Sequence, residues 1–221
     1  MVETNRSKGP KGSNGYKQLR ARLRAAEVAL ADERERVAAL ARQVPPGPEL
    51  PDYVLHAASD GEEVRLSELF DHRGALVVYH LPVPAEVDEC CPSCSMWLDA
   101  LNSATDQVMV NAGFAVVAKA KLARLALWAL RQDWSELRVL SSETSSFDRD
   151  LGFEAPDGAG ELGLSVLVRD TAQRVRLFYS VKAVMEDAGW RHNDLFSPVW
   201  QALDLLPSGR EVRARRPGRY Y

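Results

Sequence analysis

The stretch Glu89-Cys90-Cys91-Pro92-Ser93-Cys94-Ser95-Met96-Trp97 holds all three cysteines of the chain. It follows the apolar run Ala75-Leu76-Val77-Val78-Tyr79-His80-Leu81, which is typical of a buried strand. Pro92 favours a helix start, because the N–H that proline lacks has no partner at the first helical position. The sequence therefore predicts a buried strand that leads through a loop into a Cys-x-x-Cys motif at a helix start.

This placement predicts the chemistry of Cys91 and Cys94. As the cap residue, Cys91 would lie beside free N–H groups at the positive end of the helix dipole, which lowers a thiol's pKa. Cys94, one turn further, can resolve a mixed disulfide. The arrangement is that of the thioredoxin fold. We expect thiol–disulfide exchange with a thiol or disulfide partner and no dedicated organic cofactor, with Cys90 as a third thiol.

Two alternatives stay open for the cysteine cluster. Cys90 and Cys94 are spaced Cys-x-x-x-Cys, and thiolates together with an imidazole bind copper or zinc. The candidate ligands are Cys90, Cys91, Cys94 and His80, although a histidine in an apolar strand is more often a hydrogen-bonded core residue. The second alternative is a non-catalytic binding module of the same fold.

Composition limits the function classes. The 221 residues carry a net charge of -3 and are 46% hydrophobic, so neither nucleic acid nor a membrane is an expected partner of the whole chain. Residues 1–15 lack the apolar core of a signal peptide. We expect a cytoplasmic protein, and in that compartment a close Cys pair is more often catalytic or metal-binding than structural.

The chain is expected to have an N-terminal arm and one domain. Residues 1–15 are too polar to order themselves, and residues 16–44 predict an amphipathic helix that lies against the domain or pairs with a second copy to form a homodimer. Its apolar series is Tyr16, Leu19, Leu23, Ala26, Leu30, Val37, Leu40 and Val44. A proline-rich linker (45–51), the domain (52–211) and a basic tail (212–221) follow.

Within the domain, apolar runs alternate with helical patterns. Strands are expected near residues 53–55, 75–81, 114–118 and 137–140, with a hairpin formed by 164–168 and 174–179. Helices are expected after the cysteines, over 122–134 and over 197–205, whereas 141–160 is expected to be a loop. The alternation predicts an α/β fold, a thioredoxin-like (peroxiredoxin-like) three-layer sandwich with a mixed central sheet.

The chain resembles the thioredoxin-like domain-of-unknown-function family 899, whose members are labelled predicted dithiol-disulfide oxidoreductases. The resemblance covers about residues 30–211. The matching pieces are Leu66-Ser67-Glu68-Leu69-Phe70-Asp71, Leu76-Val77-Val78-Tyr79-His80, Cys91-Pro92-Ser93-Cys94-Ser95-Met96-Trp97, Ser141-Ser142 with Phe147 and Asp150, Ser165-Val166-Leu167 with Arg169-Asp170, and Leu203-Asp204-Leu205 with Pro207 and Gly209-Arg210. The resemblance implies a thioredoxin-like fold with a redox-active Cys91 and Cys94.

Overall fold

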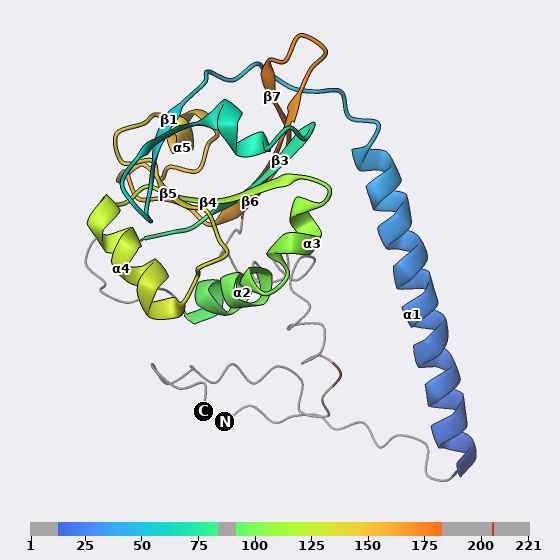
Figure 1. Cartoon of the computed structure of the whole chain (residues 1–221). Helices are drawn as coiled ribbons and strands as arrows, with labels where there is room; N and C mark the ends of the chain where they lie inside the picture. Colours follow the sequence, from blue (N-terminus) through green and yellow to red (C-terminus); the bar gives the residue numbers. More distant parts are fainter. Residues whose placement is uncertain (1–12, 84–91, 183–204, 206–221) are drawn as a thin grey trace. The chain divides into compact units, whose positions relative to one another are not determined.

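The computed structural model describes residues 13–83, 92–182 and 205 (Figure 1). The chain divides into two compact units, Met1–Pro45 and Pro46–Tyr221. The first contains helix α1, Ser13–Ala41, which confirms the predicted N-terminal helix. No Gly or Pro interrupts α1 after its first turn, and Pro45 and Pro46 follow it, where a helix cannot continue.

The second unit is built on a seven-stranded mixed sheet in the order β2-β1-β5-β4-β3-β6-β7. Strand β3 is parallel to β4, and β4 to β5, whereas the pairs β1–β2, β1–β5, β3–β6 and β6–β7 are antiparallel. The strands are β1 Val54–Ala57, β2 Glu63–Arg65, β3 Ala75–His80, β4 Gly113–Ala118, β5 Val139–Ser141, β6 Gly163–Arg169 and β7 Val175–Lys182. This topology confirms the predicted thioredoxin-like α/β fold.

Two hydrophobic clusters cover the two faces of the sheet, and helices lie on both of its sides (Figure 1). On one face lie α2 (Pro92–Asn102), α3 (Thr105–Met109) and α4 (Leu122–Gln132). On the other lie the short 3-10 helix η1 (Leu66–Phe70) and α5 (Phe147–Asp150). The central strands are apolar on both faces, as expected for parallel strands covered by helices.

Strand β3 divides its side chains between the two clusters. Tyr79 faces the cluster that contains Cys94 and Leu98 of α2. Leu76 and Val78 face the other cluster, with Phe147 and Phe153. Because side chains alternate along a strand, His80 points to the same side as Val78.

The structure differs from the sequence-based expectation in two short helices. Residues 141–160 were expected to be a loop, but they contain α5, a single turn whose Phe147 is fully buried. Helix α3 was likewise not expected. Both helices are too short for a period of 3.6 residues to be visible, so tertiary packing rather than local pattern forms them. The expected helix over 197–205 lies outside the described residues, except for Leu205.

Residues 47–50 of the proline-rich stretch run along the outer edge of β7. Gly47 N–H donates to the Leu177 carbonyl at 2.7 Å, and Leu50 N–H to the Val175 carbonyl at 2.9 Å. A Cβ on Gly47 would lie 2.9 Å from the Leu177 carbonyl oxygen, so this close approach needs glycine. Arg176 adds ion pairs to Glu49 and Asp170.

Candidate active site

Helix α2 begins at Pro92 and carries Cys94 in its first turn. The Cys94 side chain is 3% exposed and packs with Leu98, which is fully buried. One turn on, Trp97 stacks on Tyr79 of β3, with ring centroids 4.4 Å apart and an interplanar angle of 15°. These contacts hold the start of α2 against the face of the sheet to which Tyr79 points.

The other two cysteines, Cys90 and Cys91, lie outside the described residues, so their predicted roles remain predictions. The helix start at Pro92 nevertheless makes Cys91 the residue that directly precedes α2. The neighbouring Ser95 is 3% exposed, and its Oγ makes no hydrogen bond among the residues that the structure describes.

The ends of β3 and β4 and the loop before β6 come together where β3 ends. The Leu81 N–H donates to the Val117 carbonyl of β4 at 2.8 Å. A Cβ on Gly160 would lie 3.8 Å from the Leu81 carbonyl oxygen and 3.8 Å from Cβ of Lys119. Lys119 forms an ion pair with Glu154 at 2.5 Å. The loop before β6 is thus adjacent to the end of β3, and the described residues contain no cis peptide bond.

His80, the last residue of β3, belongs to a buried polar network. Its Nε2 lies 2.9 Å from Ser165 Oγ, and its Nδ1 lies 3.5 Å from Asp148 Oδ1. Ser142 Oγ donates to Asp148 Oδ2. All four residues are at most 2% exposed. The imidazole also stacks on Phe153, with centroids 3.6 Å apart.

The surroundings of His80 favour the neutral ring. Burial lowers its pKa, because the charged imidazolium loses its hydration, and this effect outweighs the opposing interaction with Asp148. Both ring nitrogens have polar partners within the network. Buried polar groups of this kind are normally hydrogen-bonded and contribute to a single packed arrangement.

The sheet separates this network from Cys94. His80 stacks between Phe147 and Phe153 on one face, whereas Cys94 packs with α2 on the other. Of the candidate metal ligands, Cys94 and His80 therefore lie on opposite faces of the sheet, which weighs against an ion bound by these two residues together. Within residues 13–83, 92–182 and 205, no three His, Cys, Asp or Glu side chains are grouped so that they could hold a metal ion.

Sequence reasoning missed the partners of His80. Asp150 accepts hydrogen bonds from the nearby Ser146 and from Tyr53, and Asp148 accepts one from Ser142, six positions earlier in the chain. Asp148 also lies 3.5 Å from His80, which is 68 positions away in the sequence. No local signal marks it. The one available hint was a histidine in an apolar strand, since a buried imidazole needs polar partners.

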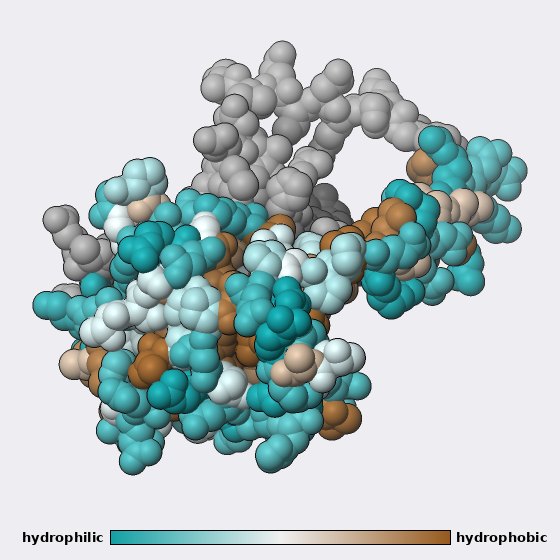
Figure 2. All heavy atoms as spheres, turned by 90° about the horizontal axis from the view of Figure 1, so that it is seen from above, coloured by the Kyte–Doolittle hydropathy of each residue, from teal (hydrophilic) through white to brown (hydrophobic). Residues whose placement is uncertain are grey.

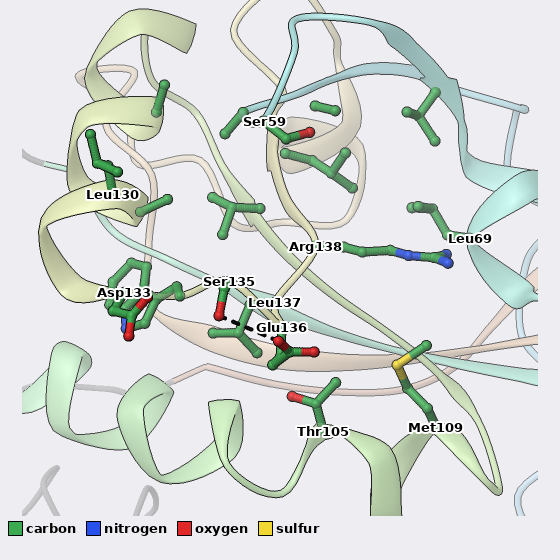
Figure 3. Close-up of a pocket in the computed structure, with 18 of the residues that line it drawn as sticks. Ser59, Leu69, Thr105, Met109, Leu130, Asp133, Ser135, Glu136, Leu137 and Arg138 are labelled. Carbon is green, nitrogen blue, oxygen red and sulfur yellow. Dashed lines mark hydrogen bonds between the residues drawn. The ribbon is translucent and has the colours of Figure 1, made fainter.

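A pocket of about 970 Å³ lies at the opposite end of the parallel strands (Figure 3). Its lining includes Thr105 and Met109 of α3 and Leu130 of α4, and it extends to Arg138, just before β5. Figure 3 shows Arg138 extending toward Leu69, and its guanidinium pairs with Asp71 at 2.9 Å. The pocket therefore lies away from the start of α2, which follows the other end of β3.

Comparison with family models gives a match over residues 8–220 to the family described as bacterial protein of unknown function (DUF899). The chain belongs to this family. The predicted family membership is thus confirmed. A comparison with curated proteins found no match.

Solved structures that resemble the chain include peroxiredoxins. Peroxidoxin BcpB from Mycobacterium tuberculosis is 17% identical, with a TM-score of 0.47 over 63% of this chain and 86% of that one. Reduced Prx3 of Vibrio vulnificus, in complex with hydrogen peroxide, is 17% identical, with a TM-score of 0.49 over 66% and 91%. Xanthomonas campestris peroxiredoxin Q is 18% identical, with a TM-score of 0.47 over 68% and 92%. At these identities, activity must be argued from this chain's own residues.

No helix in the described part of the chain is long and apolar enough to cross a membrane.

Proposed function

We propose that the protein is a dithiol–disulfide oxidoreductase that uses Cys91 and Cys94. The observation that carries the proposal is the position of Cys94. It is buried in the first turn of α2, the helix that follows the central strand β3 in the chain, and it belongs to the same hydrophobic cluster as Tyr79 of that strand. A buried thiol is reached most readily by a partner within the same chain, which suits the resolving cysteine of a pair.

The proposed reaction begins when the Cys91 thiolate attacks one sulfur of a substrate disulfide. The other substrate sulfur leaves as a thiolate, and a mixed disulfide forms. The Cys94 thiolate then attacks the Cys91 sulfur and releases the second substrate thiolate. The substrate gains two electrons, the protein retains a Cys91–Cys94 disulfide, and an external dithiol returns the pair to the reduced state. The start of α2 favours the first step, because free N–H groups at a helix N-terminus stabilise a thiolate.

The proposal requires no metal or organic cofactor, since both electrons pass through sulfur. It places the reaction in a reducing cytoplasm, where a close Cys pair would be kept as a dithiol between turnovers.

The test is alkylation of the full chain across glutathione redox buffers, read by intact mass. We expect a two-electron transition of Cys91 and Cys94 between about -270 and -120 mV, the range of known exchangers. Cys94→Ser should accumulate a mixed disulfide on Cys91, and Cys90→Ser is the matched control that should retain the transition. Absence of a reversible disulfide in this range would refute the proposal. Thiols that become reactive only after a chelator is added would also refute it and would indicate a metal site.

A further inference from the structure

Helix α1 carries an apolar stripe that its own unit cannot bury. Its apolar side chains recur at alternating steps of three and four residues, a heptad pattern, and the large ones are 44–67% exposed. They are Tyr16, Leu19, Leu23, Leu30, Val37 and Leu40. Hydrophobic residues are visible between hydrophilic ones along the surface of α1 (Figure 2). A single helix has no second layer, so this stripe needs a partner.

We propose that α1 forms a parallel coiled coil with α1 of a second copy of this chain. The observation that selects this partner is the charge pattern beside the stripe. Each heptad has two core positions, a and d, and Leu23 occupies an a position. In a parallel coiled coil, the residue directly before an a position (position g) faces the residue of the partner that is five places later in the sequence (position e). Arg22 then faces Glu27 of the partner subunit, and the two-fold symmetry of the dimer repeats this pair.

The other flanking positions of the parallel pair contain no like charges. In each case an arginine lies opposite a glycine or an alanine. These pairs are Arg20 with Gly15, Arg34 with Ala29 and Arg36 with Ala41. At these flanking positions the parallel arrangement therefore gains two attractive pairs and has no repulsive ones, whereas in the core it places Glu33 opposite its own copy.

The antiparallel arrangement that overlaps the helices over nearly their whole length is disfavoured. It places residues of like charge opposite one another on both sides of the core. These pairs are Arg22 with Arg36, Arg20 with Arg34, and Glu27 with its own copy. A shift by one heptad relieves the repulsion by placing Glu27 opposite Arg34, but it gives up about a quarter of the overlap and the apolar contact that goes with it.

Glu33 interrupts the apolar series at one core position. Within the same helix, Arg36 donates to both Glu33 carboxylate oxygens, at 2.8 and 2.5 Å. This ion pair compensates the charge that a dimer would bring to its core. A polar residue at a single core position reduces stability and fixes the register of the two helices. The proposed dimer is therefore a weak one with a defined alignment.

The test is sedimentation equilibrium of the full chain, with its thiols kept reduced so that no disulfide links two copies. We expect a dimer for the wild type. Arg22→Glu or Glu27→Arg should each raise the dimer dissociation constant about tenfold, because each turns two attractive pairs into repulsive ones. The double variant should restore the wild-type value. Arg24→Glu, on the outer side of the same turn, is the matched control and should leave the constant unchanged.

Two results would overturn the proposal. One is a wild-type chain that is monomeric at all concentrations tested. The other is a dimer that Glu27→Arg weakens, that Arg22→Glu leaves unaffected and that the double variant does not restore, since this indicates the shifted antiparallel pair. Neither result bears on the cysteine chemistry, which the alkylation experiment measures separately.

Discussion

Replacement of His80 by phenylalanine is the most direct probe of the buried network. Phenylalanine keeps an aromatic ring between Phe147 and Phe153 but removes both ring nitrogens. Ser165 Oγ then loses a partner at 2.9 Å, and Asp148 Oδ1 loses one at 3.5 Å. An unsatisfied buried polar group costs about 1–3 kcal/mol. We expect His80→Phe to lower the free energy of unfolding by about 3 kcal/mol at neutral pH.

The pH dependence gives this prediction a second readout. Burial holds the pKa of His80 below the value of 6.5 that applies to the unfolded chain. Below pH 6.5 the unfolded state therefore binds more protons than the folded state. The wild type loses stability as the pH falls toward the folded pKa, by up to about 1.4 kcal/mol per pH unit. The variant lacks this titration. The difference in free energy of unfolding between wild type and His80→Phe should therefore become smaller by about 1 kcal/mol as the pH is lowered from 7.5 to 5.5.

The assay is urea unfolding followed by tryptophan fluorescence at several pH values. His72→Asn is the matched control, because His72 is exposed and has a φ of 65°, which asparagine adopts readily. The control should match the wild type at every pH. A His80→Phe deficit that stays constant from pH 7.5 to 5.5 would refute the argument that His80 is held neutral by burial. A deficit near zero would show that the network contributes little to stability.

Two further changes test other parts of the fold. Gly113→Ala should lower the melting temperature by several degrees, because the added Cβ would lie 2.2 Å from the Leu69 carbonyl oxygen. Gly74→Ala is the control and should leave the melting temperature unchanged, because nothing lies within 4 Å of a Cβ at that position. Hydrogen bonds, first from Arg176, lower the pKa of Asp170 from 3.8. Asp170→Asn should therefore lower the free energy of unfolding at neutral pH, and this loss should become smaller as the pH falls below 3.8. A loss of free energy of unfolding that does not change with pH would contradict this prediction.

Local pattern was sufficient for the elements with long apolar runs. The strand expected over 75–81 is β3, Ala75–His80, and the one expected over 114–118 is β4, Gly113–Ala118. The helix expected over 122–134 ends two residues earlier, at Gln132, because Asp133 adopts a left-handed conformation and caps it. In each case the apolar period reflects a face that must be buried, so the residues themselves carry the information.

The candidate site was predictable only in part. Proline at the first helical position correctly indicated where α2 begins. The pairing of His80 with Asp148 and Ser165 was not predictable, because the three residues come together only when β3, α5 and β6 are in place. Contacts between segments so distant in sequence depend on topology, which one sequence does not encode in any local pattern.

The residues that run along β7 have a consequence for anyone who shortens the chain. Gly47–Leu50 occupy hydrogen-bonding groups on the outer edge of β7 at Val175 and Leu177. A protein trimmed to begin at β1 would lose this cover and present an unpaired strand edge, a template for aggregation. The opposite edge strand, β2, is short and carries Glu63 and Arg65, which discourages such pairing. The proline-rich segment thus covers the edge of β7, and a soluble fragment should begin no later than Pro46.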